Sequence, residues 1–165
     1  VEKVLENDPR IAEMAADFGD TRDFFFLGRS GDFPVAMEGA LKLKEIAYVR
    51  AEGYAAGEMK HGPIALIEPG VVVVGSATDQ HIKTKTLSNM EEMRARGATI
   101  VLVVEEGDGE VYDVADYVVE VPRGPDLICT VTAVVPLQLL AYHVATAKGL
   151  DVDKPRNLAK TVTVE

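Results

Sequence analysis

The segment VVVVGSATDQHIKTKTLSNMEEMRARGATIVLVV, residues 71–104, carries the pattern that decides the fold. It opens with four valines and closes with the largely apolar run 99–104, and both runs suit buried strands. Between them, residues 79–95 have apolar side chains at helical spacing, and Gly97 follows as a helix stop. The inward-facing side chains are expected to be Ile82, Leu87, Met90 and Met93. This order predicts a parallel βαβ unit.

The same alternation extends in both directions along the chain. Upstream, the run 23–27 ends at Gly28, and a helix is expected over 34–50, with Asp32 as a possible cap. Downstream, the strand-like run 117–121 precedes a long apolar helix. Strands that alternate with helices, joined by right-handed crossovers, predict an α/β fold. We expect a three-layer αβα sandwich with a doubly wound parallel sheet.

Two segments are less regular. Residues 51–56 are ambiguous, with a short edge strand as one interpretation, and residues 57–67 suggest a short helix that breaks midway. In doubly wound sheets, ligands bind beyond the carboxyl ends of the strands. The loops after Leu27, Val74 and Val104 are therefore expected to form the functional rim.

The chain divides into three parts. Residues 1–20 have helical apolar spacing and are expected to be a connector helix from a preceding domain that the chain does not contain. Residues 21–150 are expected to form the αβα domain. Residues 151–165 combine polar residues with a closing Thr/Val alternation, which predicts a tail that folds back toward a site.

Composition excludes several classes of partner. With a net charge of -10 and no basic cluster, the chain is not expected to bind nucleic acid. Cys129 is the single cysteine, which excludes an internal disulfide and favours a buried thiol in a cytoplasmic protein. The run 127–147 is apolar, yet Gln138 and His143 interrupt it, so a buried or interfacial helix is favoured over a membrane span.

The loop 28–31 lies between a strand and a helix, where a phosphate-binding loop would lie. It matches neither the dinucleotide fingerprint nor the Walker loop. A tight turn is therefore the favoured interpretation, and no cofactor or metal ion is expected.

The candidate chemistry concentrates on one helix and on two residues elsewhere in the chain. On the helix 34–50, the side chains of Glu38, Lys42 and Glu45 fall within about 60° of one another. Spacing alone favours an ion-pair ladder, although a glutamate beside a lysine can also be tuned for proton transfer. His61 lies at a break before Gly-Pro, and Lys160 of the tail could form a Schiff base with a carbonyl.

Four segments carry a close resemblance to a known enzyme family. They are residues 37–45 (MEGALKLKE), 51–63 (AEGYAAGEMKHGP), 135–144 (VPLQLLAYHV) and 151–160 (DVDKPRNLAK). Together they resemble the glucosamine-6-phosphate synthases, the glutamine–fructose-6-phosphate aminotransferases. The resemblance covers nearly the whole chain and is to the second of the two sugar-isomerase (SIS) subdomains in their C-terminal half.

The resemblance implies an activity and a role for each candidate. Such enzymes convert fructose-6-phosphate and glutamine-derived ammonia to glucosamine-6-phosphate. Glu45 then resembles the acid/base that moves a proton between C1 and C2, and Lys42 supports it. His61 resembles the ring-opening residue, offered to the neighbouring subunit of a homodimer. Lys160 resembles the Schiff-base lysine, and Ala159 would lie against the sugar through its backbone.

The resemblance also implies missing parts and leaves alternatives open. The loop that grips the sugar phosphate belongs to the first SIS subdomain, and ammonia release belongs to a glutaminase domain. Without them, we expect these 165 residues to be inactive or nearly so alone. Glu38 is left with a structural role. The alternatives are part of an amino-sugar-phosphate deaminase or isomerase, and a non-catalytic sugar-phosphate-binding module.

Overall fold

Five strands form one parallel sheet in the order β2-β1-β3-β4-β5, in a computed structural model that describes residues 1–156. The strands are β1 (Asp23–Gly28), β2 (Arg50–Ala55), β3 (Val72–Ala77), β4 (Thr99–Glu105) and β5 (Tyr117–Val121). The α-helices are α1 (Glu2–Leu5), α2 (Asp8–Asp17), α3 (Asp32–Ala47), α4 (Lys83–Arg94) and α5 (Asp126–Ala147). Three short 3-10 helices are η1 (Ala56–His61), η2 (Pro63–Leu66) and η3 (Gly109–Asp113).

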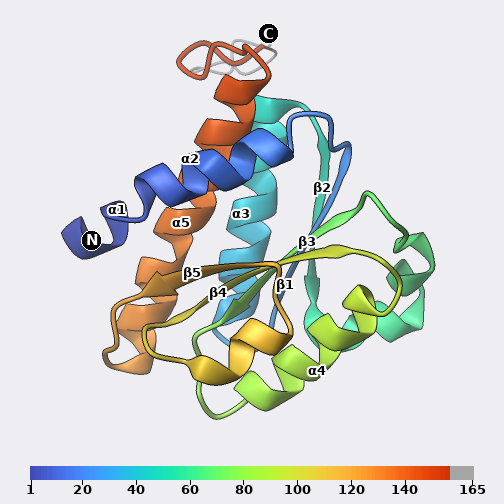
Figure 1. Ribbon diagram of the computed structural model, residues 1–165, viewed down its shortest axis with the longest axis vertical. Helices are drawn as coiled ribbons and strands as arrows, with labels where there is room; N and C mark the ends of the chain where they lie inside the picture. Colours follow the sequence, from blue (N-terminus) through green and yellow to red (C-terminus); the bar gives the residue numbers. More distant parts are fainter. Residues whose placement is uncertain (157–165) are drawn as a thin grey trace, which may run out of the picture.

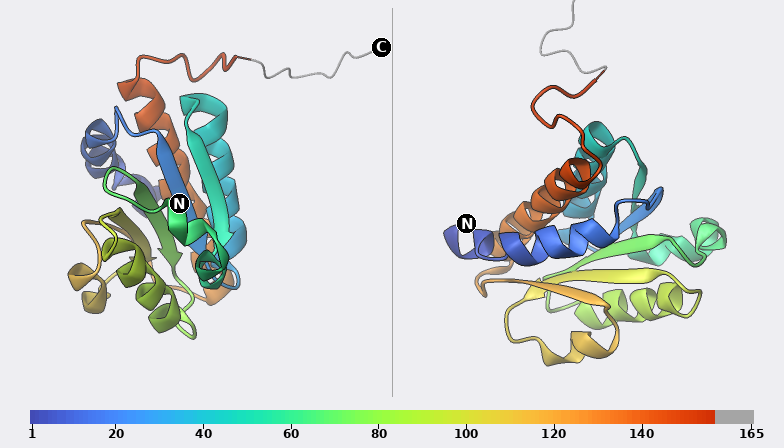
Figure 2. Two further views of the ribbon diagram at one scale, coloured as in Figure 1. Left: turned by 90° about the vertical axis from the view of Figure 1, so that its right-hand side faces the viewer. Right: turned by 45° about the horizontal axis from the view of Figure 1, so that its top comes forward.

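Alternating side chains divide the core between the two faces of the sheet. Phe24 and Phe26 of β1 pack with α2, α3 and α5, whereas Phe25 and Leu27 pack on the side of α4 and the 3-10 helices. Figures 1 and 2 show these helix layers on the two sides of the sheet. This alternation is the period of two that a strand buried on both faces requires. The expected three-layer αβα sandwich is confirmed.

A tight turn carries the chain from β1 into α3. A Cβ atom on Gly28 would lie 2.2 Å from the carbonyl oxygen of Asp32, so only glycine fits there. Ser30 adopts a left-handed conformation with φ of 51°. The helix starts at Asp32, and this residue does not cap it, because its carboxylate turns away toward β3. The prediction of Asp32 as a cap is therefore wrong.

The irregular region after α3 follows the predicted outline. Tyr48 ends α3 in a left-handed conformation, with φ of 56°. The ambiguous segment 51–56 is resolved as the edge strand β2. The predicted broken helix is a pair of 3-10 helices that meet at Gly62, whose φ of 147° favours glycine.

The N-terminal helices pack on the domain. Ile11, Met14 and Phe18 of the α2 region are buried in the same core as α5. The imidazole Nε2 of His143 lies 2.7 Å from Asp8 Oδ1, which fastens the start of α2 to α5. Residues 1–20 therefore contribute to the core, and their origin in a preceding domain stays a prediction.

Helix α5 is buried along one face only. Its inward side chains include Cys129, Ala133, Leu137, Leu140 and Val144. Within residues 1–156 it is the one helix that is long and apolar enough to cross a membrane, and 39% of its most apolar window is buried here. Its burial against α3 and α2 gives it a place in the domain core. The remaining apolar surface of α5 lacks a partner within the described chain.

Candidate functional site

The predicted stripe on α3 is a chain of ion pairs. Lys42 Nζ lies 2.6 Å from Glu45 Oε2 and 3.8 Å from Glu38 Oε1. The side chains of Lys42 and Glu45 are 33% and 27% exposed, so a ligand can reach them. The hydrogen bond to Glu45, with the charges of Glu45 and Glu38, raises the pKa of Lys42 despite partial burial. Lys42 is therefore a cation at neutral pH, and its ammonium group holds the side chain of Glu45 by a hydrogen bond.

The described part of the tail returns to the end of α3 that carries Glu45. The backbone N–H of Arg156 donates to the hydroxyl of Tyr48 over 2.7 Å, and the guanidinium lies 4.0 Å from the centre of its ring. Figure 1 shows the tail leaving α5 beside this end of α3. Ala159 and Lys160 lie outside the described residues, and their roles stay predictions.

His61 lies in a different layer from Glu45. It ends η1, where the neighbouring Met59 is fully buried in the core on the α4 side of the sheet. Lys60 Nζ pairs with Glu92 Oε1 of α4 over 2.8 Å, which fixes η1 on that side. Because α3 covers the opposite face, this chain does not bring His61 and Glu45 together. His61 is exposed to solvent.

The rim beyond the carboxyl ends of the strands is closed by its own side chains. Asp32, Glu105 and Asp108 are only 1%, 8% and 6% exposed. Asp108 pairs with Lys83 over 2.9 Å, and Glu105 accepts a hydrogen bond from Gln80 over 3.0 Å. The functional rim was predicted here, yet Glu45 lies near the far end of α3, whereas His61 ends η1, which follows the carboxyl end of β2. Residues 1–156 contain no group of three or more metal-ligating side chains placed to hold a metal ion.

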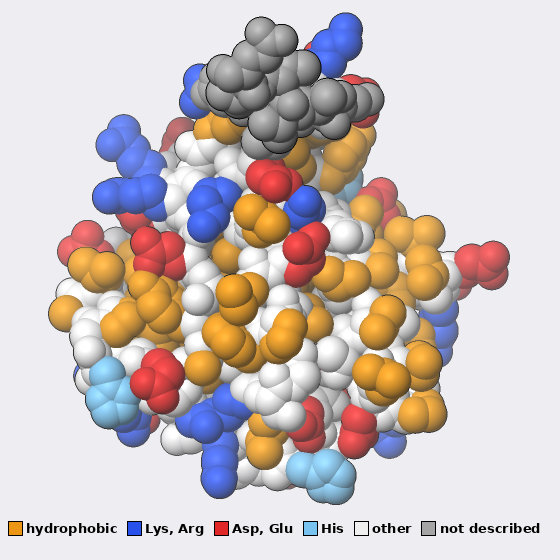
Figure 3. Space-filling view, turned by 180° about the vertical axis from the view of Figure 1, so that it is seen from behind, with side chains coloured by type: hydrophobic (Ala, Val, Ile, Leu, Met, Phe, Trp, Pro, Cys, Tyr) orange, Lys and Arg blue, Asp and Glu red, His pale blue; other side chains and the backbone are white. Residues whose placement is uncertain are grey.

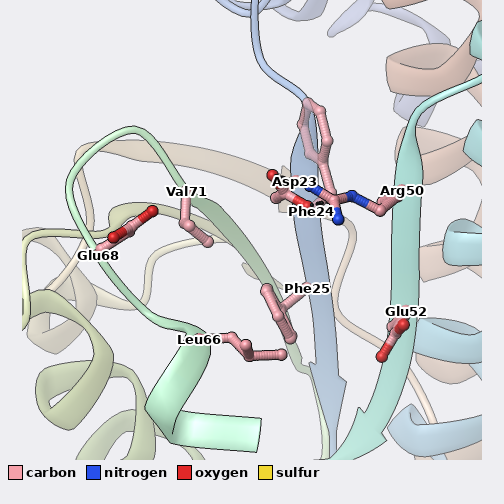
Figure 4. A pocket seen from close by; sticks show the side chains of 8 residues that line it. All are labelled: Asp23, Phe24, Phe25, Arg50, Glu52, Leu66, Glu68 and Val71. Carbon is pink, nitrogen blue, oxygen red and sulfur yellow. Dashed lines mark hydrogen bonds and ion pairs between the residues drawn. The ribbon is translucent and has the colours of Figure 1, made fainter.

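Two surface hollows of the described residues are lined by side chains other than Lys42, Glu45 and His61. The hollow of about 190 Å³ in Figure 4 lies over the amino ends of β1 and β2, where Arg50 pairs with Asp23. A second hollow, of about 660 Å³, is lined by Met37, Leu41 and Tyr54 in the groove between α3 and the edge strand β2. Lys42 and Glu45 line neither hollow.

Cys129 is a buried structural thiol, as expected from the sequence. It is fully buried, and its Sγ donates to Glu105 Oε1 over 2.9 Å. Burial, reinforced by the hydrogen bond to Glu105, raises the pKa of Cys129 from 9.0 to about 11. A thiol of this kind is a poor nucleophile at neutral pH.

We expect the native thiol to resist a disulfide reagent. At pH 8 its thiolate fraction is about 100-fold lower than in the unfolded chain, and burial slows access further. Absorbance assays with a chromogenic disulfide should therefore show reaction at least about 100-fold slower without guanidinium than with it. The pKa of Cys129 is higher in the folded chain than in the unfolded chain, so the protonated thiol stabilises the fold. This contribution is full below pH 9 and is lost as the pH rises toward 11. Equal reaction rates in the two conditions would contradict the buried assignment.

Comparisons with known proteins agree on one family. Residues 18–148 match the family model described as SIS domain. The whole chain is 54% identical to glutamine–fructose-6-phosphate aminotransferase (isomerizing) of Thermus thermophilus and covers 27% of it. The C-terminal domain of glucosamine-fructose-6-phosphate aminotransferase from Francisella tularensis matches with a TM-score of 0.84 at 41% identity, over 92% of this chain and 43% of that one. Glucosamine-6-phosphate deaminase from Thermotoga maritima matches with a TM-score of 0.69 at 28% identity, over 97% and 48%.

Proposed function

The chain belongs to the SIS domain family, and from that premise we propose that it is the proton-transfer half of an aminotransferase that isomerises a sugar phosphate. The substrates would be fructose-6-phosphate and glutamine-derived ammonia, and the product glucosamine-6-phosphate. The observation that carries this proposal is the partly exposed Lys42–Glu45 pair, with 2.6 Å between Nζ and Oε2, at the end of α3 to which the tail returns. The 54% identity to an aminotransferase of this name supports it.

Each of the candidate residues has a separate role in the proposed reaction. Glu45 takes a proton from one of the two carbons C1 and C2 of the open-chain sugar and returns it to the other. Lys42 is a cation that orients the carboxylate of Glu45 and stabilises its negative charge. Lys160 forms the Schiff base that makes the carbon proton easier to remove, with Ala159 touching the sugar through its backbone. Lys160 is the fourth residue after Arg156, so the chain can span at most about 14 Å between them.

We propose that His61 opens the sugar ring in the site of a second copy of the chain. Two observations support a homodimer. His61 is exposed in the layer opposite Glu45, and α5 presents Leu127, Ile128 and Val131 at 74%, 55% and 59% exposure. Figure 3 shows apolar side chains gathered on the outer face of the α3 and α5 layer. Such a patch commonly marks an interface.

Further parts of the enzyme would lie outside this chain. The chain spans about a quarter of the length of the curated relatives it matches, 27% of the Thermus protein. We propose that a first SIS subdomain holds the sugar phosphate and that a glutaminase domain releases the ammonia. The free, buried thiol of Cys129 fits a reducing compartment, and we place the enzyme in the cytoplasm.

A deaminase is the second candidate. The 28% identity to the Thermotoga deaminase favours it, because that likeness extends over 97% of the chain. Both reactions pass through an imine and a C1–C2 proton shift, so the same Glu45 and Lys42 would serve either. Dependence of glucosamine-6-phosphate formation on glutamine, in a full-length enzyme that contains these residues, separates the two.

Chemical trapping tests the proposed Schiff base. A full-length enzyme that contains these residues is mixed with fructose-6-phosphate and reduced with borohydride, and its peptides are analysed by mass spectrometry. The peptide with Lys160 should gain the mass of the sugar phosphate, less one water and plus two hydrogens, because reduction fixes the imine. Lys160→Arg should abolish the adduct, and Lys154→Arg should retain it. An adduct on a different lysine would refute this role.

A further inference from the structure

A buried network of four hydrogen bonds surrounds the carboxylate of Asp32. Its Oδ1 accepts hydrogen bonds from the hydroxyls of Ser76 and Thr78, each over 2.7 Å. Its Oδ2 accepts from the backbone N–H groups of Thr78, over 2.8 Å, and Asp79, over 3.2 Å. Two hydroxyl and two amide donors therefore converge on one buried anion.

The network lies at the carboxyl ends of β1 and β3. Asp32 follows β1, and its donors lie at the end of β3 and in the loop after it. The chain reverses its direction of winding between these two strands. In sheets of this strand order, the crevice outside the carboxyl ends of these two strands is the usual ligand site. Convergent amide and hydroxyl donors at such a place are suited to an anion such as a phosphate group.

The crevice has no room for a ligand in this chain. Asp32, Ser76 and Thr78 are 1%, 1% and 0% exposed, so their donors and acceptors satisfy one another out of contact with water. Glu105 adds a second buried carboxylate to the same rim, and Gln80 ties it to the loop that supplies the donors. A phosphate approaching this rim would meet negative charge and no free donor among these residues.

We propose that Asp32 is a built-in anion that occupies a latent phosphate site and keeps sugar phosphates out of this crevice. The ligand class that the donor set would otherwise take is a phosphate monoester. The phosphate group of any substrate must then be held by protein outside this rim. The inference stands independently of the proposed reaction, because it concerns stability and anion binding and needs no turnover.

Removing the carboxylate tests the proposal in the 165-residue chain. Asp32→Gly leaves four donors without an acceptor and should lower Tm by roughly 5–10 °C. Inorganic phosphate should restore at least about half of that loss saturably, and formate, which matches the lost carboxylate in size, should do the same. Chloride at equal ionic strength serves as the salt control. In Asp32→Asn the amide fills the space, so neither phosphate nor formate should raise Tm. Adding Ser76→Ala to Asp32→Gly removes one donor and should weaken the effect of phosphate on Tm several-fold.

Each other outcome counts against the proposal. Equal phosphate effects on the wild type, Asp32→Asn and Asp32→Gly would show that phosphate acts as a general salt. Recovery with formate alone would overturn the assignment to phosphate, and an Asp32→Gly chain that stays unfolded at every phosphate concentration would overturn the latent site. In the wild type, the amide resonances of Thr78 and Asp79 should not move on addition of phosphate. A saturable shift would show that the crevice is open.

Discussion

Replacing Glu45 by glutamine is expected to lower kcat for sugar isomerisation by roughly 10²–10⁴-fold in a full-length enzyme that contains these residues. Glutamine keeps the shape of the side chain and its place beside Lys42 but cannot accept the carbon proton. The measurement is glucosamine-6-phosphate formation at saturating substrate. Release of ammonia from glutamine, proposed to occur in another domain, should remain intact.

The same helix offers a matched control. Glu38 also pairs with Lys42, over 3.8 Å, and its side chain is 39% exposed against 27% for Glu45. Glu38→Gln should therefore change kcat by less than about threefold, because it removes a surface ion pair and no proton acceptor. Each variant should lose well under about 1 kcal/mol of stability, since i,i+3 and i,i+4 pairs on half-exposed helix faces contribute little.

The two variants together separate catalysis from structure. Equal losses of kcat in Glu45→Gln and Glu38→Gln would mean that the two glutamates act only by holding Lys42 in place. An unchanged kcat in Glu45→Gln, with altered affinity for the sugar phosphate, would favour a binding module over an enzyme. Retained KM with a lost kcat is the result expected of a residue that acts in the transition state.

The parts of the fold that could be predicted depend on local pattern. The apolar runs that became β1, β3, β4 and β5 are short, β-branched or aromatic, and bounded by turn residues. The spacing of Glu38, Lys42 and Glu45 on one helical flank follows from 3.6 residues per turn, and the ion pairs confirm it. Local pattern also identified the break before Gly62, although it did not show that both halves are 3-10 helices.

The features that escaped prediction depend on contacts between distant residues. Asp32 looked like a helix cap, but its acceptors meet donors 44–47 residues away, which become neighbours only once β1 and β3 pair. The Arg29 guanidinium similarly reaches the side chain of Asn89, 60 residues along the chain. Local spacing also could not predict how far His61 and Glu45 lie from each other in the fold. Strand order and burial put η1 and α3 on opposite faces of the sheet, and the proposal that His61 serves a neighbouring subunit rests on this separation.

Mixing two inactive variants should restore activity if His61 serves the neighbouring subunit. Each proposed active site takes Glu45 from one subunit and His61 from the other. In a heterodimer of Glu45→Gln and His61→Asn subunits, one active site therefore carries both substitutions and the other carries neither. With random pairing, half of the dimers are heterodimers, so about one quarter of wild-type activity should return. Against parents reduced roughly 10²-fold or more, this is a large gain. Co-expression with two different affinity tags isolates the heterodimer, which should have about half the wild-type activity per dimer.

A second pair of variants provides the control. Glu45 and Lys160 are proposed to act in the same site from the same chain, so Glu45→Gln mixed with Lys160→Arg should leave every site damaged and restore no activity. Recovery in the first mixture alone assigns His61 to the partner's site. If neither mixture recovers, His61 acts within its own subunit, which would require η1 to leave the α4 layer where Met59 is buried and Lys60 is paired. Burial and pairing oppose that movement, so we expect the first result.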